Sequence, residues 1–264
     1  MFLRALLVIA SGFIFIFSPG LPMGLISRYS PDYKRDLVYW GIGLWLVTNL
    51  INQFFSSILR QVMYQGAASV GFTGQPLDFS FIFFSALIAA LFIGLGMLIV
   101  LRIKSKDQPA PALMADGLAL GFGAGLVAQV FTGIILVGAG FQVLFGNTAS
   151  NITVEAISTS NALLLSASII ALILFRVAFL AVSAVQGVLT AQSIGHKKGR
   201  FWIAVLAMTL FMALVISIQL ILGGAEAGQV SVGITPAPIS IATAIYYLAA
   251  FIAAYYWLIN TFKD

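Results

Sequence analysis

Seven long runs of apolar residues constrain the fold of this chain more than any other feature. Each run reaches the roughly 20 residues that an α-helix needs to cross the hydrocarbon core of a membrane. The runs occupy residues 5–26, 38–59, 79–101, 113–143, 161–190, 201–222 and 239–261. We therefore predict an all-α, polytopic bundle of about seven transmembrane helices that forms one integral membrane domain over residues 1–264.

The composition supports this class and excludes several kinds of site. Of the 264 residues, 61% are hydrophobic and 8% are charged, whereas about a quarter of the residues in a soluble domain are charged. The chain has no Cys and one His, His196. Disulfides, thiolate metal sites and an ordinary zinc site are therefore excluded, and we expect neither a metal nor a cofactor.

The basic residues predict an orientation rather than a nucleic-acid site. They lie in small groups at the ends of apolar runs, not along one polar face, so no nucleic-acid partner is expected. Three groups of three, at 28–35, 102–106 and 197–200, alternate with loops that hold one base or none, and Lys263 follows the last run. By the positive-inside rule these groups are cytoplasmic, which places the N-terminus outside and the C-terminus in the cytoplasm.

The first run predicts a retained helix rather than a signal peptide. It ends in Ser18-Pro19-Gly20-Leu21-Pro22 and shows no small-residue cleavage pattern. We expect a proline-kinked first span.

Small residues in the fourth run predict close helix packing. They recur every four residues, with Gln129 at the one missing step, so they should form a smooth ridge on one helix face. The fifth run offers a matching series around Gly187. A groove for a substrate or a lipid is the alternative interpretation of the same ridge. The predicted packing residues are Gly117, Gly121, Gly125, Gly133 and Gly187.

Arg176 lies near the middle of the fifth run, more than ten residues from either end. An arginine at that depth costs several kcal/mol unless it is paired or hydrated, so it should face the interior of the bundle. No acidic residue lies at a comparable depth. The possible partners are helix carbonyl groups, the amides of Gln129, Gln186 and Gln219, or an anion from outside the chain, such as a lipid headgroup or the carboxylate of another subunit.

The segment Gly121–Ala128, followed by Phe175-Arg176 and Ser183, resembles the YhfC family of intramembrane peptidases. That family is related to the CAAX-protease and bacteriocin-processing (CPBP) glutamic membrane proteases. The resemblance extends over most of the chain and implies a similar set of about seven spans, with catalytic groups in the fourth, fifth and sixth helices.

The catalytic residues that the resemblance implies are replaced in this chain. The family's His and Glu in the fourth helix fall at Ala124 and Ala128. Its Glu and His in the fifth helix fall at Phe175 and Ser183, and a further His falls near Met208. Of that motif only Arg176 and the glycines persist.

The remaining side chains lead to the same conclusion. Peptide hydrolysis needs a group that activates water and one that stabilises the oxyanion, but we find no Asp, Glu, His, Cys or Lys in the interior of a predicted span. Arginine cannot serve as a base at physiological pH.

We therefore expect a pseudoenzyme without catalytic residues: a non-catalytic scaffold or accessory subunit of a larger membrane complex, with lipids and other membrane subunits as partners, in a prokaryotic cytoplasmic membrane. Two alternatives remain. One is a subunit that binds or transports a lipid or small hydrophobic solute. The other is a peptidase with displaced catalytic groups, in which Glu155 or Glu226 reaches Arg176 from an outer loop.

Overall fold

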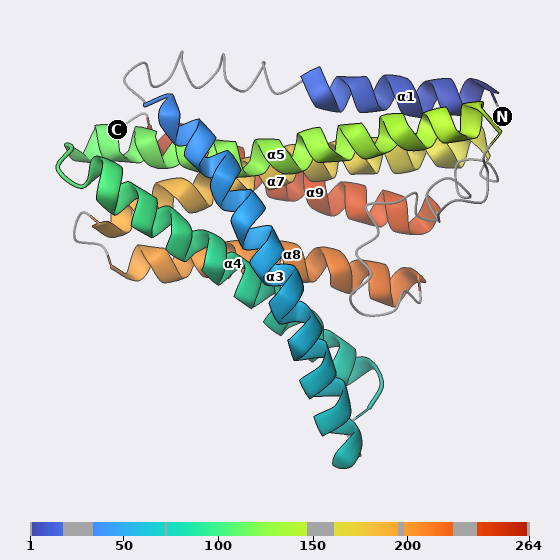
Figure 1. Ribbon diagram of the computed structural model, residues 1–264, viewed down its shortest axis with the longest axis horizontal. Helices are drawn as coiled ribbons and strands as arrows, with labels where there is room; N and C mark the ends of the chain where they lie inside the picture. Colours follow the sequence, from blue (N-terminus) through green and yellow to red (C-terminus); the bar gives the residue numbers. More distant parts are fainter. Residues whose placement is uncertain are drawn as a thin grey trace.

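The computed structural model describes residues 2–17, 34–71, 73–146, 161–194, 198–223 and 237–262. Within these ranges the chain contains helices and no strands, and six of its helices are long and apolar enough to cross a membrane (Figure 1). The all-α class predicted from the sequence is confirmed for this part of the chain. The helices are α1 (Phe2–Phe17), α3 (Asp36–Ser69), α4 (Gln75–Ser105), α5 (Ala110–Leu144), α7 (Ala162–Ile194), α8 (Gly199–Gly223) and α9 (Ala237–Thr261).

The first predicted span is described only in part. We expected a kinked helix over residues 5–26, and the described part contains α1 over Phe2–Phe17, which has 16 residues. It is apolar yet shorter than the other six helices, and it is not among those that are long enough to cross a membrane. The segment from Ser18 to Pro22, where the kink was predicted, lies outside the described residues.

The second predicted span ends too early. We placed its end at residue 59, but α3 continues to Ser69. Gln61 and Gln65 lower the hydropathy without lowering helix propensity, so a hydropathy window ends before the helix does. Arg60 consequently lies within a helix rather than in a loop. The turn to α4 is made near Gly71 and Gly74, whose positive φ angles of 73° and 77° favour glycine.

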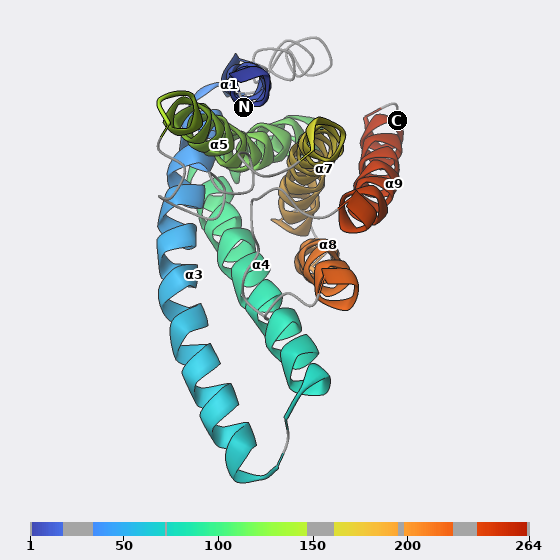
Figure 2. The ribbon, with the colours of Figure 1, turned by 90° about the vertical axis from the view of Figure 1, so that its right-hand side faces the viewer.

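Helix α5 is the most enclosed helix of the bundle. Every residue from Ala115 to Gln129 except Phe122 is buried. In Figures 1 and 2, α5 lies against α1, α3 and α7, which approach it from different sides. This position requires several faces of α5 to accept a neighbouring helix, and glycine makes that possible.

Glycines bring α5 and α7 into backbone contact. A Cβ added to Gly117 would lie 2.5 Å from the carbonyl oxygen of Gly187, and one added to Gly187 would overlap the carbonyl oxygen of Gly117. A Cβ on Gly121 would overlap the carbonyl oxygen of Ser183. One on Gly125 would come within 3.0 Å of the Cα atom of the α7 residue Leu180. Any larger residue at these positions would push the two helices apart.

Glycines also bring α5 into backbone contact with α3 and α1. A Cβ on Gly123 would overlap the backbone of Val38 in α3. Gly12 of α1 and Gly133 of α5 face each other, because a Cβ on either one would lie 2.6–2.7 Å from the carbonyl oxygen of the other. Three neighbours are therefore held at backbone distance by glycines on different sides of one helix.

The predicted single glycine ridge is consequently wrong at Gly133. Gly117, Gly121 and Gly125 face α7, but Gly133 faces α1. An α-helix has 3.6 residues per turn, so each step of four residues advances around the axis by about 40°, and sixteen residues advance it by about 160°. The series winds around α5 and serves two neighbours.

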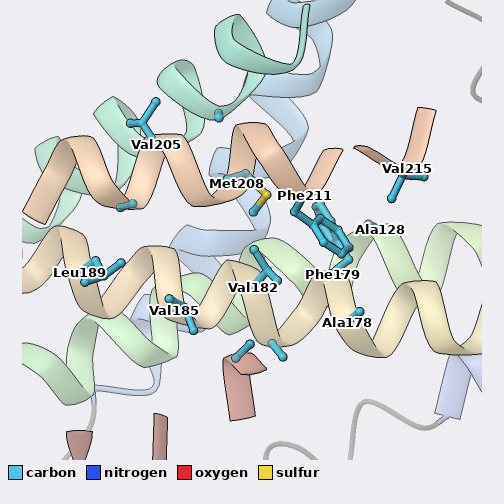
Figure 3. Close-up of a cluster of buried hydrophobic side chains, with 14 of the residues drawn as sticks. Ala128, Ala178, Phe179, Val182, Val185, Leu189, Val205, Met208, Phe211 and Val215 are labelled. Carbon is cyan, nitrogen blue, oxygen red and sulfur yellow. The ribbon is translucent and has the colours of Figure 1, made fainter. Parts of the chain in front are cut away.

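Helices α8 and α9 pack on the other side of α7. The largest hydrophobic cluster lies between α7 and α8, with side chains from α4, α5 and α9 (Figure 3). The α3–α4 hairpin runs obliquely to the other helices, and its turn projects away from them (Figure 2).

Replacing Gly187 with Ala should destabilise the protein, because the new methyl group meets a backbone carbonyl that cannot rotate away. We expect a loss of roughly 1–3 kcal/mol in unfolding free energy, measured as a lower Tm in detergent. Gly138→Ala is the matched control, since Gly138 is exposed on α5 and nothing lies within 4 Å of its added Cβ. The packing account fails if Gly187→Ala melts at or above the temperature of Gly138→Ala.

Candidate functional site

Of the five positions to which the resemblance assigns the peptidase motif, four are buried and Phe175 is partly buried, and small or apolar side chains occupy them. Ala124 and Ala128 on α5 are 1% and 3% exposed, and Met208 on α8 is fully buried. Ala128 and Met208 belong to one hydrophobic cluster, against which Phe175 packs (Figure 3). The structure thus brings three of these positions into one cluster, in the contact region of α5, α7 and α8.

The other two positions lie in separate surroundings. Ala124 packs with residues of α3 and α4 rather than with the α7–α8 cluster. Ser183 on α7 is 1% exposed, and its carbonyl oxygen faces Gly121. None of the five positions carries a carboxylate or an imidazole. Within the described residues no group of three or more His, Cys, Asp or Glu side chains is placed to hold a metal ion.

Phe175, the position to which the resemblance assigns a Glu, belongs to a cluster of five aromatic rings from three helices. The rings of Phe175 and Phe211 stack with centroids 6.1 Å apart and planes 7° apart, and the centroid of Phe175 lies 5.0 Å from that of Tyr247 on α9. The hydroxyl of Tyr246 donates a hydrogen bond to the carbonyl oxygen of Phe211 (3.2 Å). The aromatic cluster comprises Phe175, Phe179, Phe211, Tyr246 and Tyr247.

Arg176 lies beside this aromatic cluster. Its side chain is 8% exposed, and its guanidinium carbon lies 4.8 Å from the centroid of the Phe175 ring. The Nε atom is buried and has no hydrogen-bond partner. Within the described part of the chain no carboxylate lies within ion-pair distance of the guanidinium.

The glutamine amides that we expected to satisfy Arg176 are used elsewhere. Gln186 donates from Nε2 to the carbonyl oxygen of Ala90 on α4 (3.0 Å), which ties α7 to α4. Its Oε1 is buried without a partner. Gln129 is 4% exposed on α5, and no hydrogen bond joins it to Arg176 in the described ranges. Gln186 therefore does not accept a hydrogen bond from Arg176, and Glu155 and Glu226 lie outside the described residues.

Asp116 is a buried polar group with several partners, and the sequence analysis did not single it out. It is 0% exposed near the start of α5. Its Oδ1 accepts a hydrogen bond from the backbone N–H of Lys34 (3.0 Å), and its Oδ2 accepts one from the Ser105 hydroxyl (2.5 Å). The Lys34 ammonium lies 3.9 Å from Oδ2. Three segments therefore meet at one carboxylate.

Gln108 completes this group. When the amide of Gln108 is oriented with its nitrogen toward Asp116, the nitrogen donates to Asp116 Oδ2 and the oxygen accepts from Lys34 Nζ, each at 2.7 Å. Lys34 Nζ also donates to the carbonyl oxygen of Lys104 (2.7 Å). The α4–α5 linker and the start of α3 are thereby tied to α5. In the sequence, Asp116 is a single acidic residue in an apolar helix. Its partner Lys34 lies 82 residues away, so the sequence does not show that the two residues pair.

No family model, curated protein or solved structure matches this chain.

Replacing Asp116 with Ala should destabilise the protein, because the change leaves the Lys34 backbone N–H, the buried Ser105 hydroxyl and the Gln108 amide without their acceptor. We expect a loss of about 1–3 kcal/mol, the usual cost of leaving a buried polar group without its hydrogen-bond partner, measured by thermal or denaturant unfolding in detergent. Asp36→Ala is the control. Asp36 is an exposed acid 3.9 Å from Lys104, and its removal should cost about 1 kcal/mol or less. Equal losses for the two variants would show that the Asp116 group does not hold the linker.

Proposed function

We propose that this chain is a non-catalytic membrane protein that serves as a scaffold or accessory subunit of a larger membrane complex. The observation that supports this function best is Arg176, a buried charge for which the described part of the chain supplies no carboxylate. An unpaired charge inside a membrane protein is costly, so it persists where something outside the chain neutralises it. The carboxylate of a neighbouring transmembrane subunit would do so.

The absence of a catalytic group at the motif positions also favours a non-catalytic role. Hydrolysis needs a base at the water and a donor at the oxyanion. At the corresponding positions the described structure has two alanines, Phe175, Ser183 and Met208, and three of these five side chains pack in one apolar cluster. On the YhfC resemblance we propose that the peptidase scaffold is kept and hydrolysis is lost.

The proposal also includes the membrane in which the protein lies and the orientation of its termini. The alternation of basic groups between loops supports a cytoplasmic C-terminus and an outer N-terminus. We propose an integral protein of a prokaryotic cytoplasmic membrane, with lipid around it and other subunits at its side. A chain that consists mainly of helices and short connections has lateral contacts as its chief means of action.

A second candidate function has one observation in its favour. Arg176 Nε and Gln186 Oε1 are both buried without hydrogen-bond partners. Each is a buried polar atom that a ligand could satisfy, Arg176 as a donor to an anionic group and Gln186 as an acceptor from an amide. A subunit that binds a lipid or a hydrophobic solute is therefore the alternative.

Native mass spectrometry of the protein, extracted from its own membrane in a mild detergent, distinguishes these functions. The proposal predicts a stoichiometric complex with at least one other chain. A lone chain that carries one specific lipid or solute would contradict the subunit role and support the binding role. A lone and empty chain would contradict both.

Replacing Arg176 with Met tests the role of the unpaired charge. In the isolated chain the variant should melt at the same temperature as the parent or higher, because an apolar side chain replaces a buried and unpaired cation. In the native membrane the same variant should lose the co-purifying subunit. Arg102→Met, at an exposed arginine near the end of α4, is the control and should keep the subunit. Retention of the subunit by Arg176→Met would overturn the role assigned to this residue.

A further inference from the structure

We propose that the surface where the start of α3 meets the end of α4 binds the headgroup of an anionic phospholipid. Arg35, Tyr39, Trp40 and Gly43, at the start of α3, and Lys104 of α4 form this surface, which we call the headgroup surface. The inference rests on the proposed function only in placing these helices in a membrane.

Three contacts fix the start of α3 against the end of α4. The ammonium nitrogen of Lys104 lies 5.4 Å from the centroid of the Trp40 ring and 3.9 Å from Asp36 Oδ2. The Lys34 ammonium donates a hydrogen bond to the carbonyl oxygen of Lys104 (2.7 Å), which is 70 residues away in the sequence. Both segments lie toward the same end of the long axis of the molecule (Figure 1). Folding thus brings a tryptophan and several bases together.

The chain balances the charges of this surface only in part. The Lys34 ammonium faces the buried carboxylate of Asp116. Lys104 has only Asp36, and because their side chains are 38% and 53% exposed, water weakens that ion pair. Arg35 is exposed and makes no ion pair with any residue that the structure describes. Arg35 and Lys104 therefore keep donors for an anion from outside the chain.

Large exposed side chains next to these bases provide a surface for lipid. Tyr39, Trp40 and Val47 on α3 are 72%, 48% and 55% exposed. Gly43 lies three or four residues from each of them and therefore shares their helix face. Nothing lies within 4 Å of a Cβ added to Gly43. An acyl chain can therefore lie against the helix backbone between these three side chains.

The aromatic residues indicate the depth of the headgroup. Tryptophan and tyrosine are enriched at the boundary between hydrocarbon and water, where the ring is in an apolar layer and its polar atom meets the headgroups. A lipid whose chain lies over Gly43 has its phosphate near Trp40, one helical turn closer to the start of α3. The Lys104 ammonium lies at that place, where its attraction to the Trp40 ring holds it.

The charge of this end of the structure favours an anionic lipid over a zwitterionic one. Residues 34–36 and 102–107, together with Asp116, contain five bases and three acids. A zwitterionic headgroup carries its own cation, which these bases repel, whereas phosphatidylglycerol carries a net negative charge. Each Lys or Arg near the membrane surface contributes a factor of about five to the affinity for anionic lipid.

The opposite end of α3 provides a matched control. Arg60 is an exposed base there, and the sequence has no other base between Arg60 and Arg102. Its guanidinium carbon lies 5.9 Å from the centroid of the Tyr64 ring. Arg60 is about 30 Å from Trp40 along the helix, so its charge should not affect which lipid contacts Trp40.

Fluorescence quenching at Trp40 tests the proposal. The protein is placed in vesicles of equal parts phosphatidylglycerol and phosphatidylcholine, in which the acyl chains of only one of the two lipids carry bromine. The difference between the parent and Trp40→Phe isolates the Trp40 signal. We expect stronger quenching when phosphatidylglycerol carries the bromine. Equal quenching by the two lipids in the parent would overturn the proposal.

Charge variants test which residues select the lipid. Lys104→Gln and Arg35→Gln should each lower the relative binding constant for phosphatidylglycerol about fivefold, whereas Arg60→Gln should leave it unchanged. Both replaced side chains are exposed, and quenching by brominated phosphatidylcholine shows that each variant still lies in the bilayer. An unchanged constant in both variants would contradict the proposal.

Failure of this inference is distinguishable from failure of the proposed function. A protein that leaves its own membrane with another subunit, but shows no lipid preference at Trp40, would lose the headgroup surface and keep the accessory role. A clear lipid preference in a chain that co-purifies with no other subunit would show the opposite.

Discussion

Backbone contact through glycine is the interaction on which the rest of this structure depends. Side chains alone would keep α5 at ordinary helix distances from its neighbours. Gly117, Gly121, Gly123 and Gly133 instead let carbonyl groups of α7, α3 and α1 approach the backbone of α5. Without a hydrophobic force between helices inside lipid, such close packing is a main source of stability. Helix α5 thus holds α1, α3 and α7 together.

The same packing decides what the interior can do chemically. Small residues at Ala124 and Ala128 face tightly packed neighbours, so the region that would correspond to a peptidase site is filled by hydrophobic side chains. Polar groups persist in two different forms. Asp116 is fully buried and surrounded by donors, whereas Arg176 is nearly as buried and has an unpaired Nε. The Asp116 group joins three segments of the chain, whereas Arg176 has no carboxylate partner within the described residues.

The sequence predicted what depends on local composition. The apolar runs gave the helical class and the approximate place of the six long helices, because hydropathy is a property of single segments. It did not predict the end of α3, where glutamines prolong the helix, or the direction of Gly133, since helix rotation accumulates over sixteen residues. The Asp116 group was missed because its members are close only after folding. The exposure of α3 could be recognised only once its neighbours were placed.

The central claim is that α5 is the enclosed helix and α3 the uncovered one, and footprinting with a hydrophobic carbene tests it without any mutation. A diazirine dissolved in the lipid is photolysed around the intact protein, and peptides are mapped by mass spectrometry. The account predicts the least label between Ala115 and Gln129 of α5 and the most between Val47 and Val62 of α3. Labelling of that α5 segment at the level of α3 would contradict the account.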